Sequence, residues 1–563
     1  MKQAAASLSI LLITSWTAIA APTASAINHS KPVTQKNRPI PAESLYQMLA
    51  AELAIKRTQP DVALANYIAA AKQTQDPNVA KRATEIALST ASLEIALEPA
   101  ALWAKLAQKN LEAQITMAAI HLRLLQASKA VPFLTQLQII NPTQAHQHFL
   151  LLNQQLPDKE ERAELIKALD LMTKKKSSYS AELALGEILL SGAKPQEALV
   201  YSRKALRKNP NAIDSIQLYS KNLVALQQVP KAKSFLDKMA KRTDRLDINS
   251  YYLQFLVNQQ FDAEGKKVLR KISSDFKLKP SETLQLAKFS MQAEWYDESS
   301  TLLKTLKQHS ESKDIAHYFL ARIAEIEQKP KEAIEWFKQV LTGPFHVLSQ
   351  VRASVLLSQD KQYDEALIVL SRAQSQNAND KKRLLMTEIE ILNQSKQAIK
   401  ALDKLNTAVK LAPNDLELRY ARSLVSTQLN KLDLAETDLK HILVQYPNHV
   451  DALNALGYLL TNHTKRYTEA HEHLTRALKL SPNNPTILDS MGWLEYKMGK
   501  MDKALSSLQQ ASRIVPDPEI AAHLGEVLWK MKNFKAAKEI WNQALIISPN
   551  NPYILNTMER LID

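Results

Sequence analysis

The chain has 563 residues, more than one hydrophobic core usually supports, so its length argues against a single compact domain. Cysteine is absent, which excludes disulfides, a cysteine nucleophile and a lipid on an N-terminal cysteine, and 8 glycines are too few for a phosphate-binding loop. The formal charge of +15 at pH 7 favours affinity for acidic surfaces.

The first 26 residues predict a secretory signal peptide. Lys2 precedes an apolar run over 4–21, and the small residues 24–26 match the pattern at which such peptides are cut. We expect cleavage after Ala26, or after Ala20, and a periplasmic location with association at the outer membrane. The alternative is an uncleaved anchor, because about 18 apolar residues barely span a bilayer.

Residues 27–41 are polar and contain several prolines, which predicts a flexible lead-in. From residue 42 onward a small residue recurs in one phase every 33–35 positions, the period of stacked helical hairpins. In the section 42–176 few of the other repeat residues accompany the phase residues. Within it, 157–176 is predicted to be an irregular junction between repeats. The phase residues of the section are Ala63, Ala96, Ala130 and Ala163, with Glu164 as the alternative to the last.

The middle section, 177–344, keeps the phase, and a leucine four residues later recurs in most of its repeats. Spacings of three and four residues put these side chains on one face of a helix. The phase residues here are Ala198, Ala232, Gly265, Ser299 and Ala333.

The section 345–551 is the most regular. Its phase residues are Ala366, Ala401, Ala435, Ala470, Ala504 and Ala537, and the bulky residues four places later are Leu370, Leu405, Leu439, Leu474, Leu508 and Trp541. A small residue lets two helix backbones approach, the large one fills the space between them, and a following proline ends the second helix. Residues 552–563 are predicted to form a capping helix over the last hairpin. The whole pattern predicts an all-α chain of about fifteen hairpins without a β-sheet.

These residues resemble the tetratricopeptide repeat family, whose signature is a Leu-Gly pair followed by Ala, a large residue, Ala and Pro at fixed offsets. The match is seen at Leu456–Gly457, Met491–Gly492 and Leu524–Gly525, each with the phase residues that follow, and again at Leu185–Gly186. The resemblance implies a right-handed α-solenoid in which the first helix of each hairpin lines a concave groove that binds polypeptides. The overall pattern is also similar to large bacterial outer-membrane-associated members of the family, including adaptors of carboxy-terminal processing proteases.

No constellation of catalytic or metal-binding residues is found in the sequence. The phosphate-loop, dinucleotide and nucleophile-elbow motifs are absent. His471 and His473 are two residues apart, so on a helix they point in different directions, and position 475 is Thr where a zinc-binding helix needs His. We therefore expect no enzyme activity, no cofactor and no metal.

The groove implied by the resemblance has side chains that can be assigned by phase. Aromatic residues beside lysines would suit a peptide with an acidic segment, although Trp493, Tyr496 and Trp529 also fit a packing role between hairpins. Asn454 and Tyr458 stand where the family's carboxylate clamp would need Lys and Asn, so a receptor for chaperone tails is disfavoured. The candidate partner-binding residues are Tyr420, Asn454, Tyr458, Asn462, Trp493, Lys497, Trp529 and Lys530.

The sequence thus predicts a non-catalytic scaffold of the bacterial cell envelope that binds protein partners, among them a carboxy-terminal processing protease and its substrates. One alternative is a structural component of an envelope assembly or secretion machine. Another is a binder of acidic envelope glycan or lipid. Nucleic acid is not expected as a partner of an exported chain, and membrane contact is expected only peripherally or through a partner.

Overall fold

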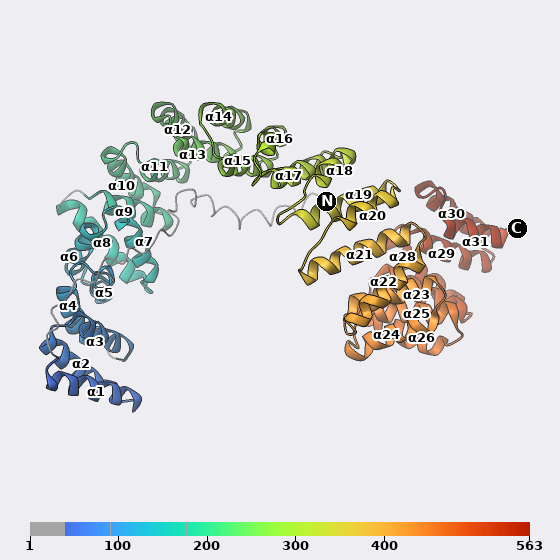
Figure 1. Cartoon of the computed structure of the whole chain (residues 1–563), viewed down its shortest axis with the longest axis horizontal. Helices are drawn as coiled ribbons and strands as arrows, with labels where there is room; N and C mark the ends of the chain where they lie inside the picture. Colours follow the sequence, from blue (N-terminus) through green and yellow to red (C-terminus); the bar gives the residue numbers. More distant parts are fainter. Residues whose placement is uncertain (1–39, 91, 176–177, 563) are drawn as a thin grey trace. The chain divides into compact units, whose positions relative to one another are not determined.

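The computed structural model describes residues 40–90, 92–175 and 178–562. The predicted signal peptide and residues 27–39 of the predicted lead-in lie outside the described residues. Every regular element in the described part of the chain is a helix, as predicted, and no strand occurs there. Contacts divide the chain into two compact units, the first ending at Phe276 and the second beginning at Lys277 (Figure 1). The predicted sections 42–176, 177–344 and 345–551 are defined by how regular their repeats are. The division into two units does not test those boundaries.

The helices of the first unit follow one another in chain order along it (Figure 1). They are α1 (Ala42–Lys56), α2 (Pro60–Thr74), α3 (Pro77–Thr90), α4 (Leu93–Leu106), α5 (Leu111–Arg123), α6 (Ala127–Ile140), α7 (Ala145–Gln155), α8 (Lys159–Lys175), α9 (Tyr179–Ser191), α10 (Pro195–Lys208), α11 (Ile213–Ala225), α12 (Val229–Thr243), α13 (Leu246–Asn258) and α14 (Asp262–Asp275).

The second unit continues the alternation and includes one 3₁₀ turn. Its helices are α15 (Pro280–Gln292), α16 (Tyr296–Thr305), η2 (Leu306–Gln308), α17 (Lys313–Ile326), α18 (Pro330–Lys338), α19 (His346–Gln359), α20 (Tyr363–Ser371), α21 (Ala378–Gln394), α22 (Ala398–Leu411), α23 (Leu416–Gln428), α24 (Leu432–Gln445), α25 (Val450–His463), α26 (Tyr467–Leu480), α27 (Pro485–Lys497), α28 (Met501–Ile514), α29 (Pro518–Lys530), α30 (Phe534–Ile547) and α31 (Pro552–Ile562).

Within the described residues, consecutive odd-numbered and even-numbered helices form hairpins from α1–α2 through α29–α30, except at α7 and α8, and α31 follows them. The turn inside most hairpins contains one residue with a left-handed backbone, five positions before the phase residue. Gly499 fills this position with φ of 77°, and Lys361 fills the equivalent one with φ of 62°. Glycine adopts this conformation without strain, whereas other residues are uncommon there. The recurrent turn therefore fixes the angle at which each second helix returns.

The core consists of the side chains that define the repeat. Ala470, Ala504 and Ala537 are fully buried, as are Leu474, Leu508 and Trp541 four residues after them. The signature glycines complete this packing, since a Cβ at Gly492 would lie 2.7 Å from Leu508 Cγ. The small and large residues that set the predicted phase are therefore the ones that pack between the two helices of these hairpins.

The predicted irregular junction, 157–176, contains α8 and begins just after α7. Helix α8 packs on α6 and α9, and α7 packs on α9, whereas α7 and α8 do not form the close pair seen in the other hairpins. In this repeat Ala163 is exposed, while Leu165 and Ala168 are buried. The small residue that keeps phase with the other repeats thus faces solvent here, because α8 presents a different face to the core.

The last hairpin is covered by α31, as predicted for the capping helix. Ile554 is fully buried and belongs to the cluster that contains Trp541 and Ala537. Asn556 and Glu559 are exposed, whereas Arg560 bonds to the carboxylate of Glu526 on α29. None of the helices in the described residues has both the length and the apolar content needed to cross a membrane.

Candidate functional site: the first-helix wall of the second unit

The first helices of the C-terminal hairpins form a continuous wall, because α25 contacts α27 and α27 contacts α29. Asparagine and aspartate start two of these helices. Asn484 accepts a hydrogen bond from the backbone of Thr486 at α27, and Asp517 accepts one from Glu519 at α29. Proline follows each cap, which matches its preference for the first helical position. These two helices of the wall therefore each begin at an N-cap of their own.

Trp493 lies at the centre of this wall and is only 7% exposed. Its indole stacks on His523 of α29, with ring centroids 4.0 Å apart, and its Nε1 donates to Asn462 Oδ1 of α25 at 2.7 Å. Asp489 lies 2.9 Å from Nδ1 of His523. Of the two roles predicted for Trp493, packing between hairpins is the one that this geometry supports; that it binds a partner remains a prediction.

Two tyrosines connect the helices through carboxylates, of which Glu526 is buried and Glu519 is partly buried. Tyr458 on α25 donates to Glu519 Oε1 on α29 at 2.7 Å, and Tyr496 donates to Glu526 Oε1 at 2.9 Å. Burial raises the pKa of both hydroxyls, and the nearby glutamate charge raises each pKa further. Both tyrosines therefore remain protonated donors throughout the physiological range. That the wall suits a peptide with an acidic segment remains a prediction.

The remaining candidates divide into exposed and packed residues. Lys497 is exposed, with Nζ 4.6 Å from the ring centre of Trp493, and Lys530 is also exposed. Trp529 is partly buried and packs edge-on against Phe534 of its own hairpin, with centroids 4.6 Å apart. Asn454 carries a buried side-chain oxygen, Oδ1, without a hydrogen-bond partner among the described residues. An orphaned amide oxygen on this wall is a polar group that a bound peptide could satisfy.

Tyr420 lines a separate open hollow on the same row of helices, with a cavity volume of about 450 Å³. His449, the N-cap of α25, lies with its ring 6.2 Å from that of Tyr420. Lys382 of α21 pairs with Asp415 and Glu417 at 2.9 and 2.6 Å. Burial raises the pKa of Tyr420, and the charge of Asp451 adds to the increase. The hollow thus joins an aromatic face to several carboxylates.

Sequence reasoning missed the partners of these residues. His523 and Glu519 were not predicted to lie in the site, although each bonds to a residue one or two repeats away. A search for complementary polar residues separated by about one repeat would have found the pairs Asp489–His523 and Asn462–Trp493.

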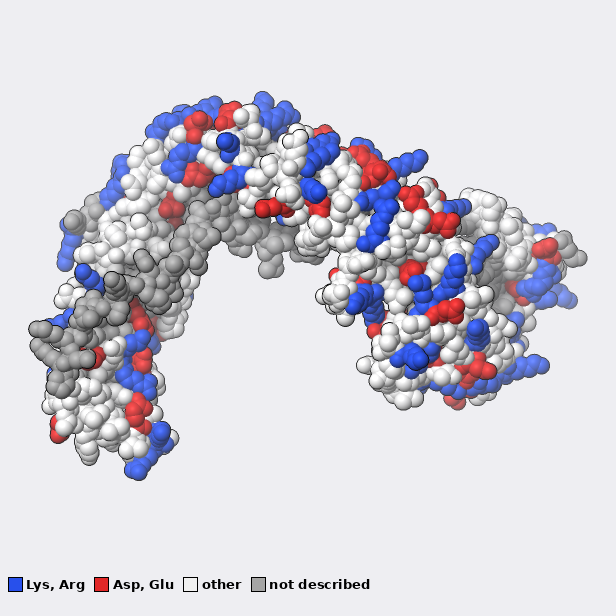
Figure 2. Space-filling view, in the orientation of Figure 1, with Lys and Arg blue, Asp and Glu red and all other residues white. Residues whose placement is uncertain are grey.

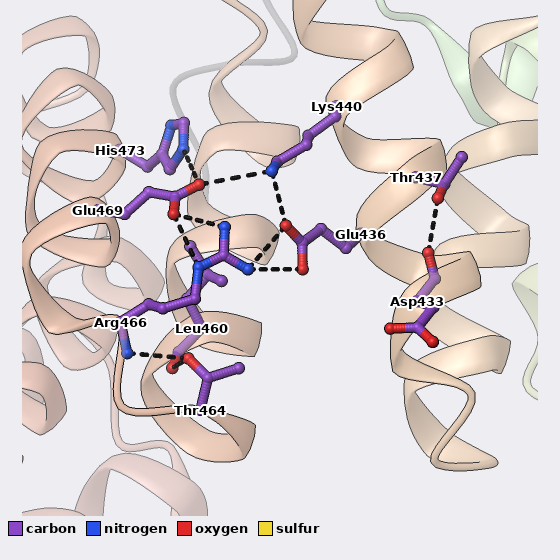
Figure 3. Close-up of polar contacts among 9 residues, drawn as sticks. All are labelled: Asp433, Glu436, Thr437, Lys440, Leu460, Thr464, Arg466, Glu469 and His473. Atoms are coloured by element: carbon purple, nitrogen blue, oxygen red, sulfur yellow. Dashed lines mark hydrogen bonds and ion pairs between the residues drawn. The ribbon is translucent and has the colours of Figure 1, made fainter.

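The second helices of the same unit present a different surface, on which charges pair with one another. In Figure 3, Lys440 and Glu436 of α24 and Glu469 of α26 surround Arg466, the N-cap of α26. Glu436 is bonded by two cations, Arg466 at 2.8 Å and Lys440 at 2.7 Å. Burial alone would raise the pKa of Glu436, but these hydrogen bonds hold the pKa below its ordinary value. His473 lies 4.0 Å from Glu469.

No group of three or more His, Asp or Glu side chains is arranged to hold a metal ion within the part of the chain that the structure describes. The wall offers hydrogen-bonding groups, partly exposed rings and two exposed lysines. These are the elements of a binding surface.

Fold and site together define an all-α repeat protein whose helical hairpins stack into a solenoid. Tetratricopeptide repeat models match residues 427–485, 463–523 and 518–551. The chain is 32% identical over 489 residues to the TPR repeat-containing protein PA4667 of Pseudomonas aeruginosa, covering 86% of this chain and 82% of the relative. The chain therefore belongs to the tetratricopeptide repeat family.

Several solved structures are similar to this chain. One is Naa15/Naa10 bound to HypK-THB, at 12% identity and TM-score 0.33, covering 92% of this chain and 96% of that one. Another is the APC/C hetero-tetramer Cut9-Hcn1, at 14% identity and TM-score 0.33, covering 93% and 97%. A thermophilic TPR protein of Thermus thermophilus matches at 22% identity and TM-score 0.29, covering 32% and 95%.

Proposed function

We propose that this chain is a non-catalytic scaffold that binds partner polypeptides on the wall formed by α23, α25, α27 and α29. Tetratricopeptide repeats imply a protein–protein interaction scaffold, and the observation that carries the choice of surface is the unpartnered, buried Oδ1 of Asn454. A buried acceptor without a donor is unfavourable, and an N–H group of a bound peptide would satisfy it. Exposed Lys497 and Lys530 border the same wall and would bind carboxylate or carbonyl oxygens.

We propose further that the mature chain works in the bacterial cell envelope and brings substrates to a periplasmic protease. The support is the predicted signal peptide over 1–26 and the similarity to envelope-associated family members that act as protease adaptors. A fixed component of an envelope assembly machine is the alternative. The two differ in what they bind, because an adaptor exchanges substrates whereas a machine component keeps constant neighbours.

The test is site-specific photo-crosslinking in cells. A photoreactive amino acid replaces Asn454, Lys497 or Lys530 on the wall, and exposed Lys503 or Gln509 on α28 as matched controls. We expect the wall positions to capture polypeptides that the controls do not. Capture of a protease together with varied polypeptides supports the adaptor, and a constant set of membrane-complex subunits supports the machine component. Equal capture from both faces contradicts the proposed wall.

A further inference from the structure

Charge in the first unit is concentrated on the second helices of three consecutive hairpins. Helices α10, α12 and α14 carry 13 Lys and Arg against 5 Asp and Glu, whereas the first helices α9, α11 and α13 carry 1 against 4. Figure 2 shows these basic side chains along the outer edge of the unit, over the three helices. We call this surface the basic band; it consists of Arg203, Lys204, Arg207, Lys208, Lys231, Lys233, Lys238, Lys241, Arg242, Lys266, Lys267, Arg270 and Lys271.

The repeat geometry aligns these charges. Arg203 lies five residues after the phase residue Ala198, Lys238 six after Ala232, and Arg270 five after Gly265. Equivalent positions of stacked hairpins lie side by side along the unit. Basic side chains at similar positions of the three second helices therefore recur along the unit.

Several of these charges are not neutralised within the protein. Arg203, Arg207, Lys238 and Lys267 are exposed and have no carboxylate within 4.0 Å among the described residues. Arg203 and Arg207 are also four residues apart on one helix, an arrangement of like charges that destabilises a helix. The second helices α24, α26 and α28 of the other unit carry 5 Lys and Arg against 6 Asp and Glu, and Figure 3 shows Lys440 of α24 paired with Glu436 and Glu469. Stability therefore does not account for the basic band.

The band lacks the apolar groups that usually anchor a protein partner. Val200, at 52%, is the one large apolar side chain more than a third exposed within the described helices α10–α14. Protein interfaces depend on buried aromatic and apolar side chains at their centre. A lipid surface with anionic headgroups needs no such anchor, because each Lys or Arg near it contributes independently to adsorption.

We propose that the basic band adsorbs the protein to an anionic lipid surface by binding headgroup phosphates. The inference goes beyond the proposed function and does not depend on it, since the band lies in the first unit and the partner-binding wall in the second. Arg203 and Arg207 bind phosphate oxygens through their guanidinium groups, and Lys238 and Lys267 act as point charges.

The experiment measures sedimentation of the chain beginning at Ile27 with vesicles. One set contains phosphatidylglycerol in phosphatidylcholine and the other phosphatidylcholine alone. We expect binding only to the anionic vesicles, and its loss in about 1 M salt, where the Debye length falls to about 3 Å. The variant Arg203→Gln/Arg207→Gln/Lys238→Gln/Lys267→Gln should bind on the order of 1,000-fold more weakly, since each of the four removed cations contributes about 1 kcal/mol.

A matched variant removes two Arg and two Lys that are exposed in the second unit: Arg372→Gln/Arg513→Gln/Lys479→Gln/Lys503→Gln. It should bind the anionic vesicles as the unchanged protein does. Equal weakening of both variants would show that net charge alone acts, and would overturn the assignment to the band. Binding to phosphatidylcholine alone, or binding to a DNA duplex but to neither vesicle, would overturn it as well. Circular dichroism establishes that each variant retains its helices.

Discussion

The hydroxyl of Tyr458 on α25 donates to the carboxylate of Glu519 on α29, 2.7 Å away, and so joins two hairpins that have a third between them. Most contacts in a solenoid connect only neighbouring repeats, so their stabilities combine approximately pairwise. This bond instead couples hairpins that are not adjacent, and it makes α25–α29 more cooperative than the repeats before them.

Replacing Tyr458 with Phe should therefore destabilise three hairpins together. A hydrogen bond to a charged group contributes about 1.5–3 kcal/mol, and partial access of water to Glu519 reduces the loss to about 1–2 kcal/mol. Amide hydrogen exchange, measured by mass spectrometry, should become faster across α25, α27 and α29. The control is Tyr446→Phe, since Tyr446 is 52% exposed. If exchange increased in α25 alone, the coupling would be absent.

The second prediction concerns Arg560 of the capping helix α31. This side chain bonds to Glu526, whose carboxylate is buried and also accepts the hydroxyl of Tyr496. Arg560→Ala leaves a buried charge with one donor fewer, at a cost of about 1–3 kcal/mol after allowance for the exposure of Arg560. We expect faster exchange in α29 and α30. Glu559→Ala, on the exposed side of the same helix, should leave both helices unchanged.

Gly525 and Trp541 give a prediction about packing. A Cβ at Gly525 would overlap the indole of Trp541, which is fully buried. Gly525→Ala gains about 1 kcal/mol of helix propensity but costs about 1–3 kcal/mol through overpacking, and the backbone cannot relax easily between two packed helices. We expect a net loss of stability in chemical denaturation of the second unit.

The matched test of this clash is the double variant Gly525→Ala/Trp541→Leu, because leucine occupies the equivalent position in the two preceding hairpins. The smaller side chain should recover part of the loss, so the two changes should be non-additive by about 0.5–3 kcal/mol. Additive effects would show that the glycine is not required by the indole.

The sequence predicted the repeat well because the side chains that set its period are those that pack between helices. Ala504 and Leu508 are fully buried in the structure, and helix geometry sets the spacing of four residues between them. Ala163 shows the limit of this argument: it keeps the phase in sequence but is exposed, because α8 packs with a different face. Phase identifies a repeat, but only the packing of neighbouring helices decides which face is buried.

The candidate site was harder to predict, for a reason seen at Trp493. Its position on the first-helix wall follows from phase, yet its burial comes from His523 and Asn462 on the neighbouring hairpins. How closely adjacent hairpins approach depends on the curvature of the stack, which a single sequence does not specify. The exposure of Lys497 and Lys530 follows from their chemistry, because long charged side chains at the end of a helix remain in water, but their binding of a partner stays a prediction.

The last prediction concerns acid and His317 of α17. This side chain is 8% exposed, stacks on Trp336 with centroids 5.6 Å apart, and contacts the carbonyl of Gln339 through Nδ1 at 3.3 Å. Burial lowers its pKa, and nearby Lys307 and Lys313 act in the same direction, while the Gln339 carbonyl and Asp314 oppose them. The folded protein therefore favours the neutral imidazole.

Because the pKa is lowered on folding, the unfolded chain takes up a proton first as the pH decreases. The stability associated with His317 is complete above the ordinary histidine pKa of about 6.5 and is lost as the pH falls through the lowered folded value. Hydrogen exchange in α17 and α18 should accelerate on acidification, and His317→Gln should reduce that pH dependence, whereas His463→Gln, at an exposed position, should not. If His317→Gln left the pH dependence unchanged, other groups would cause the acid sensitivity of this hairpin. An NMR titration of the His317 ring that showed protonation in the ordinary histidine range would contradict the lowered pKa.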